Sequence, residues 1–137
     1  MCKVGDIIKV EKYIGDDGSE VGRHTFVVID EDEDVIEGYN FDFVGSPMSS
    51  IKSEAQRQKV EADERLMILK TNDQNGMPAS KYDESFLKTN LFYYFKKEKI
   101  QYQVIGSLNI ETYMKLIEQL KNLDEKGLIE NVLTNLE

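Results

Sequence analysis

Two short apolar runs, joined by a glycine- and acid-rich segment, constrain this chain more than any other feature. The runs are residues 5–10 (GDIIKV) and residues 23–29 (RHTFVVI), and both are rich in β-branched side chains. Such runs favour strands, and glycines and aspartates such as those at 15–18 favour loops. We therefore predict two strands joined by a long hairpin loop, with Arg23 where the loop enters the second strand.

Size and hydropathy indicate one globular domain. The chain has 137 residues, of which 40% are hydrophobic, and this size and composition are typical of a single folded unit. No run approaches the ~20 apolar residues that a membrane-spanning helix requires, and the N-terminal residues lack the apolar core of a signal peptide. We expect a soluble, cytoplasmic protein that does not associate with membranes.

The residue types that bind metals are scarce. Cys2 is the single cysteine and His24 the single histidine of the chain. One cysteine excludes an internal disulfide and a thiolate zinc site, and one histidine argues against a histidine-rich metal centre. We expect no metal and no other cofactor.

The charge is strongly negative but uneven. A net charge of -9 repels nucleic acid at long range. Acidic residues cluster at 16–17, at 30–34 and in the last third, while basic residues gather at 52–59 and 96–99. The plain interpretation of both the acidic and the basic clusters is a solvent-exposed surface. The alternatives are a local basic groove on an acidic body, and an acidic face that suits a basic protein partner.

The middle of the chain predicts further strands and polar connections. We expect a turn at 30–34, because five consecutive acids do not fit a buried strand, and then a strand at 35–44. That strand pairs with residues 25–29 and ends at Gly45-Ser46-Pro47. We expect a surface helix or charged loop within 49–65, a strand at 66–69 and a surface loop at 71–84.

The last third is helical by periodicity. Apolar residues recur every three or four positions from Ile110 to Leu123, with Asn109 as a candidate N-cap and Glu111 in the first turn. After Gly127 a second apolar stripe runs to Leu136. This tail can pack on its own domain or in a dimer.

The opening strands and the later residues 90–108 together resemble the MazF/PemK family of toxin endoribonucleases. That family has a G-D-[IV] strand, a loop, and an R-P-x-[LV]-V-[IL] strand; here His24 stands at the position of the proline. Asn90 stands where the family often has glutamine, Lys99-Ile100 matches a basic-apolar pair, and Ile105-Gly106-Ser107-Leu108 matches the closing element.

The resemblance implies a mainly β fold with C-terminal α structure. This is an SH3-like antiparallel β-barrel, at about residues 4–108, followed by one or two helices at about 109–136, all within one domain, 1–137. The implied activity is that of a toxin of a toxin-antitoxin system. It cleaves single-stranded RNA without metal, works as a homodimer and is inhibited by a cognate antitoxin protein.

The resemblance also assigns site residues. Arg23 is expected to stabilise the phosphorane, because a guanidinium binds two phosphate oxygens at once. Ser49 is expected to assist, with Ser46 and Ser50 as alternatives. His24, Ser50, Lys88 and Lys97 are candidate RNA-binding residues, and His24 can also transfer protons near neutral pH.

Each of these residues also has a plain structural interpretation. Arg23 can pair with a nearby acid, His24 can be a half-buried or surface histidine, and Ser49 can cap a helix. The rival functional class is a non-catalytic acidic barrel that binds a basic protein or competes with nucleic acid. Cleavage of RNA in the presence of chelator separates the two classes.

Overall fold

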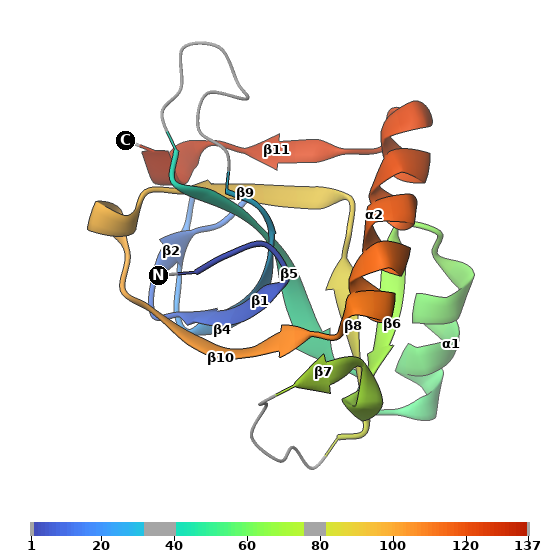
Figure 1. Ribbon diagram of the computed structural model, residues 1–137. Helices are drawn as coiled ribbons and strands as arrows, with labels where there is room; N and C mark the ends of the chain where they lie inside the picture. Colours follow the sequence, from blue (N-terminus) through green and yellow to red (C-terminus); the bar gives the residue numbers. More distant parts are fainter. Residues whose placement is uncertain (1, 32–40, 76–81, 137) are drawn as a thin grey trace.

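The computed structural model describes residues 2–31, 41–75 and 82–136, which fold around one curled, mainly antiparallel sheet (Figure 1). The sheet order is β11-β9-β5-β4-β1-β10-β7, and β8 pairs with both β5 and β6. The strands are β1 (Asp6–Val10), β4 (His24–Asp30), β5 (Phe43–Ser50), β6 (Leu66–Lys70), β7 (Gln74–Asn75), β8 (Glu84–Lys88), β9 (Leu91–Phe95), β10 (Tyr102–Leu108) and β11 (Glu130–Val132). The predicted antiparallel barrel is confirmed.

Shorter elements complete the described part of the chain. β2 (Tyr13–Ile14) and β3 (Glu20–Val21) form a small hairpin within the predicted loop between β1 and β4. The helices are α1 (Glu54–Ala62) and α2 (Ile110–Glu125), and 3₁₀ turns lie at Thr71–Asp73, Lys97–Lys99 and Thr134–Leu136. No helix among the described residues is long and apolar enough to cross a membrane.

Alternation along the strands builds a core inside the barrel. Phe26 of β4 is fully buried there, and its ring packs edge-on against Tyr13, Tyr93 and Phe95, with centroids 5.0, 5.4 and 5.2 Å away. Edge-to-face aromatic pairs at these separations are favourable beyond the area they bury. This aromatic cluster fixes the positions of β4, β9 and the β2 segment.

The outer face of the sheet forms a second core beneath α2. Leu116 of α2 is buried among Val27, Leu69 and Leu87 from three strands. Asn109 caps the helix as predicted, since its side-chain oxygen accepts a hydrogen bond from the Thr112 N–H at 2.9 Å. In Figure 1, α2 lies beside the barrel with β6, β8 and α1 behind it.

The predicted strand end at Gly45-Ser46-Pro47 is wrong, because all three residues lie inside β5. Pro47 is opposite Phe26 on β4, but it lies between the β5 residues that pair with β9 and those that pair with β8. On the edge of β5 away from β4, no neighbouring strand pairs with Pro47, so the lack of a backbone N–H at this residue breaks no hydrogen bond of the sheet there. Gly45 is needed because a Cβ there would lie 3.1 Å from the Phe26 Cβ.

The charged stretch after β5 contains α1, so the helix alternative is the one the structure supports. Ser53 caps α1 by accepting a hydrogen bond from the Gln56 N–H at 3.1 Å, and Val60 packs with Phe86 under the helix. Of the predicted turn at 30–34 and strand at 35–44, residues 32–40 lie outside the described part. Residues 76–81 of the predicted loop do as well.

The C-terminal tail is not a second helix. Gly127 ends α2 with φ of +69°, which favours glycine. Residues 130–132 then add β11 as a parallel strand beside β9, and Val132 and Leu136 are buried. Pairing with an open strand edge outweighs the apolar periodicity. The described tail therefore packs on its own barrel, which is the first of the two arrangements expected from the sequence.

Asn135 fastens this tail to β2. Its side-chain oxygen accepts a hydrogen bond from the Ile14 N–H at 2.7 Å, and its amide donates to the Ile14 carbonyl at 2.9 Å. Asn135→Ala is expected to lower the free energy of unfolding by about 1–3 kcal/mol, because it leaves these backbone groups unpaired. Urea denaturation measures the loss. Exposed Thr134→Ala is the control, and equal midpoints for the two variants would contradict the expectation.

Candidate functional site: the mouth of the barrel

Three of the predicted site residues share one face of the sheet where β4 begins and β5 ends. Thr25 and Met48 are directly opposed, so the next residues, His24 and Ser49, both lie on the other face. Ser49 is opposite Phe86 on β8, and Lys88, two residues further on, lies on that same face. His24, Ser49 and Lys88 therefore converge at this end of the barrel, which we call the barrel mouth.

The surroundings of His24 keep its ring neutral. The half-buried imidazole lies beside the contacting rings of Tyr13 and Phe26, with centroids 6.3 and 5.6 Å away. Burial lowers the pKa of His24 below its ordinary value of 6.5, and the positive charge of nearby Lys88 lowers it further. A neutral imidazole can accept a proton at neutral pH. By contrast, burial raises the pKa of Tyr13 to about 12, so that phenol stays protonated.

Arg23 lies on the rim beside the mouth, one residue before β4. Its Nε donates to a Glu11 carboxylate oxygen at 3.1 Å, and the two side chains are 63% and 43% exposed. The predicted alternative, a pairing with a nearby acid, is therefore present. An exposed pair of this kind contributes only about 0–1 kcal/mol, so an incoming phosphate can compete with Glu11 for the guanidinium.

The Arg23–Glu11 pair lies in a polar cleft of about 700 Å³. The charged side chains that line this cleft are Glu11, Lys12, Arg23, Glu98 and Lys99. Three cations and two carboxylates therefore line the cleft, but Lys12 also pairs with Glu20 at 3.8 Å and Arg23 with Glu11, so the charges of the cleft largely balance. Lys99 was among the predicted basic residues. Lys12 was not predicted to belong to a basic groove, and its position beside an apolar run in the sequence does not indicate such a role.

The structure separates the three candidate serines. Ser46 is fully buried, and its hydroxyl donates to the Leu91 carbonyl at 3.3 Å, so it serves the fold. Ser49 and Ser50 are half-buried. Ser50 is opposite Ser85 and lies on the face away from His24. Ser49 is therefore the serine that shares the mouth with His24, and its placement in β5 excludes the helix-cap interpretation.

Lys97 does not join this group. Its backbone N–H donates to an Asp42 carboxylate oxygen at 2.7 Å, and its charge acts on the buried Cys2 thiol instead. The basic residues at 96–99 thus divide. Lys97 lies toward Asp42, and Lys99 lines the Arg23 cleft.

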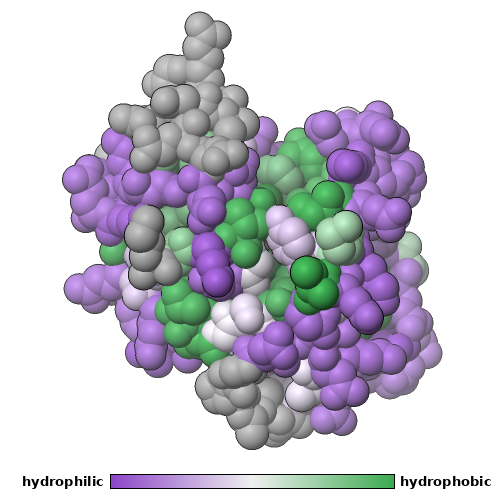
Figure 2. Space-filling model, viewed as in Figure 1, coloured by the Kyte–Doolittle hydropathy of each residue, from purple (hydrophilic) through white to green (hydrophobic). Residues whose placement is uncertain are grey.

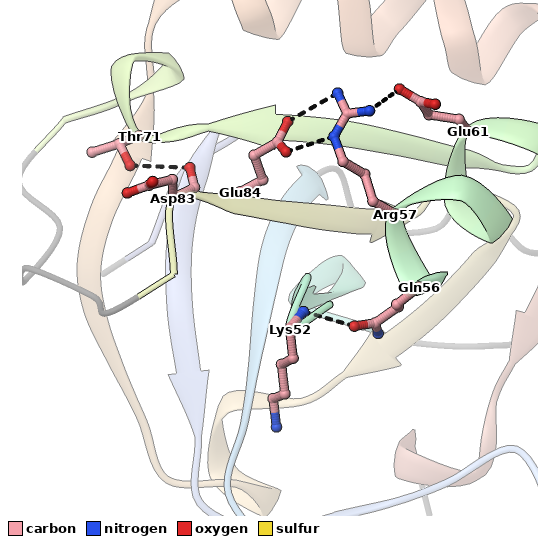
Figure 3. A network of polar contacts seen from close by, with 7 residues as sticks. All are labelled: Lys52, Gln56, Arg57, Glu61, Thr71, Asp83 and Glu84. Carbon is pink, nitrogen blue, oxygen red and sulfur yellow. Dashed lines mark hydrogen bonds and ion pairs between the residues drawn. The ribbon is translucent and has the colours of Figure 1, made fainter. Parts of the chain in front are cut away.

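A second polar cluster, shown in Figure 3, attaches α1 to the sheet. The Arg57 side chain points at Glu84 of β8, where its Nε donates at 2.7 Å, and it also pairs with Glu61 one helical turn away. Arg57 lowers the pKa of Glu84 through this hydrogen bond. Arg57, Glu61 and Glu84 already pair with one another, so these three charges hold α1 in place and do not suggest a site of reaction.

Comparisons with protein-family models, curated proteins and solved structures found no match for this chain. The described residues contain no group of three or more His, Cys, Asp or Glu side chains placed to hold a metal ion. The resemblance to the MazF/PemK family stays a prediction from its few sequence positions, and the mouth has to be judged by its own chemistry.

Proposed function

We propose that this protein is a metal-independent endoribonuclease that cleaves single-stranded RNA at the barrel mouth. The observation that carries the proposal is that His24, Ser49 and Lys88 lie on one face of the sheet at the same end of the barrel. Burial and then the charge of Lys88 lower the pKa of His24, which favours the neutral imidazole. A proton acceptor, a cation and a hydroxyl at one point are the groups that RNA transesterification requires. Arg23 on the adjacent rim adds a second cation.

The proposed reaction uses each of these residues. His24 takes the proton of the ribose 2′-hydroxyl as its oxygen forms a bond to phosphorus. Arg23 and Lys88 stabilise the additional negative charge of the phosphorane, and the Ser49 hydroxyl orients the attacking sugar. The bond from phosphorus to the 5′-oxygen then breaks, and this oxygen takes a proton from water. The hydroxide that is left takes the proton held by His24, which restores the neutral imidazole, and a 2′,3′-cyclic phosphate remains.

The same proposal includes a toxin role, and with it two protein partners. The resemblance implies a cognate antitoxin that blocks cleavage, and a homodimer whose two copies share the RNA groove. Lys12, Arg23 and Lys99 in the Arg23 cleft support RNA binding on a chain whose net charge is -9, because each can contact a phosphate.

Arg23→Ala is expected to lower the rate of RNA cleavage by about 10² to 10³, the usual cost of removing one donor to a developing anion. The substrate is a mixed-sequence RNA incubated with excess chelator, and the products are resolved by length. Arg65→Ala is the matched control, because Arg65 is also an exposed arginine, 52% accessible, in an ion pair with Asp63 at 2.8 Å. Its cleavage rate should be unchanged.

Two outcomes separate the enzyme from its rival. If the well-folded protein cleaves no RNA with or without chelator, the endoribonuclease proposal is wrong. If both arginine variants lose activity equally, Arg23 has no special role. The second candidate, an acidic binding module for a basic protein, is favoured by the Glu11 carboxylate that already occupies the Arg23 guanidinium.

A further inference from the structure

An apolar groove lies between α2 and the barrel, away from the residues assigned to cleavage. Its volume is about 360 Å³. Its barrel wall is formed by Ile29, Val44, Phe92 and Tyr94, and its helix wall by Ile117 and Leu120. We call this hollow the α2 groove. Nothing in the proposed cleavage reaction uses it.

The apolar surface continues out of the groove along α2. Ile110 is 78% exposed and Met114 is 62% exposed, and with Ile117 they recur at spacings of four and three residues on one side of the helix. Figure 2 shows hydrophobic residues gathered between α2 and the barrel, with hydrophilic residues on both sides. Large apolar side chains exposed in a continuous strip mark interaction surfaces.

Acidic residues border this strip on both sides. Asp30 and Asp124 line the groove itself, and Glu111, Glu118 and Glu125 recur every seven residues along the outer side of α2. Within the described part of the chain, the Glu111, Glu118, Asp124 and Glu125 carboxylates form no ion pair. The cations of this region are Lys115 and Lys121, so negative charge prevails.

The negative field reaches into the hollow. Burial raises the pKa of Tyr94, and the charge of Asp30 raises it further. Tyr113 on α2 shows the same effect, from burial and then from Asp30 and Glu31. A ligand that enters the groove therefore meets apolar walls together with two carboxylates, Asp30 and Asp124, and one cation, Lys121.

We propose that the α2 groove binds a basic amphipathic helix of another protein, with its apolar side chains in the groove and its lysines or arginines against the bordering carboxylates. Helices recognise such grooves through anchors at three- and four-residue spacing. The strip from Ile110 to Leu120 spans about 15 Å, or three helical turns. This inference is independent of RNA cleavage, since it uses none of the residues at the barrel mouth.

Charge selects this occupant over a second copy of the chain. The protein carries a net charge of -9, and two copies joined through this face would oppose acidic borders to acidic borders. A small apolar molecule in the groove would leave Ile110 and Met114 uncovered. A basic helix covers the strip and neutralises both borders.

Fluorescence anisotropy with a labelled synthetic peptide of about four helical turns tests the proposal. The peptide has leucines at helical spacing and lysines elsewhere, and saturable binding is expected, weaker at high salt because the contacts lie at the surface. One control peptide has the same composition with the helical spacing scrambled, and another has glutamate in place of lysine. Equal binding of either control peptide overturns the proposal.

Variants of the protein locate the contact. Ile110→Ser with Met114→Ser is expected to weaken binding at least about tenfold, and exposed Val104→Ser on β10 serves as its control. Glu118→Lys with Glu125→Lys should do the same, while Glu20→Lys with Glu54→Lys makes an equal change in net charge elsewhere. Because all these positions are exposed, thermal melting should confirm that the fold is kept.

Sedimentation tests whether a second copy of the chain, and not a basic helix, covers the α2 groove. If the protein without peptide sediments as a dimer, and Ile110→Ser with Met114→Ser converts it to a monomer, the strip is a contact between copies and the proposal is wrong. If peptide binding is unaffected by either groove pair, the peptide binds elsewhere and the proposal is wrong as well.

Discussion

The His24→Gln variant is expected to cleave RNA about 10² to 10⁴ times more slowly than the unchanged protein, the range over which general acid–base groups act. Glutamine occupies similar space beside the Tyr13 and Phe26 rings but accepts no proton at neutral pH. Single-turnover rates on one RNA substrate measure the loss. A variant that remains folded and keeps its rate would remove His24 from the mechanism.

The cleavage rate should also depend on pH, and the lowered pKa of His24 fixes the direction of that change. Because burial and then Lys88 lower the pKa of His24 below 6.5, the active neutral form prevails at neutral pH, and the rate should fall only as the pH drops below that value. Lys88→Met removes the neighbouring positive charge, so its acid limb should lie at higher pH. An acid limb that does not move in Lys88→Met would contradict the proposed proximity.

The same protonation acts on stability. The unfolded state, with an ordinary histidine pKa, binds a proton before the folded state does as the pH falls. His24 therefore contributes stability that is present above about pH 6.5 and is lost as the pH falls through the folded-state pKa. Loss of activity at acid pH has to be corrected for any loss of folded protein.

The Phe26→Ala variant is expected to lose about 3–5 kcal/mol of unfolding free energy, a large share of the ~5–15 kcal/mol typical of a domain. Phe26 is fully buried and contacts three other rings at 5.0 to 5.4 Å, so its removal leaves a cavity at the centre of the barrel. Denaturant titration measures the change. Half-buried Phe92→Ala should cost less.

A substitution at Gly45 provides a second test of how tightly the barrel packs around Phe26. Gly45→Ala places a Cβ 3.1 Å from the Phe26 Cβ, which should cost about 1–3 kcal/mol by overpacking. In the double variant the 3.1 Å contact remains, because alanine at position 26 keeps its Cβ, but the contacts of 3.4 and 3.5 Å with the Phe26 ring are lost, so the two losses should sum to slightly more than the measured loss. Strict additivity would show that the added methyl group does not contact the Phe26 ring.

The sequence predicted the fold where local patterns agree with tertiary packing. The runs at 5–10 and 23–29 form β1 and β4 because their nearly continuous apolar residues match strands with a core on each face of the sheet. The helix at 110–125 formed as expected, with its cap at Asn109. These elements depend on periodicity and capping, which are local properties.

The errors arose where distant strands decide local structure. Pro47 continues β5 because the sheet divides between β8 and β9 at that residue, and residues 130–132 form a strand because the edge of β9 is open to them. Neither of these tertiary arrangements can be predicted from the residues that neighbour Pro47 or residues 130–132 in the sequence. The sequence predicted that Arg23 can pair with a nearby acid but did not identify Glu11, since several acids lie nearby in sequence.

The order in which the chain is synthesised has a consequence for how this barrel matures. β1 pairs with β10 from Asp6 opposite Ser107 to Val10 opposite Tyr102, and Asn135 bonds to Ile14 across 121 positions. β1 can pair with β4 soon after both have left a ribosome, but its other edge must wait until residues 102–107 have been made before β10 exists. Until then its unsatisfied backbone edge is open to chaperones or to misassembly with other nascent chains.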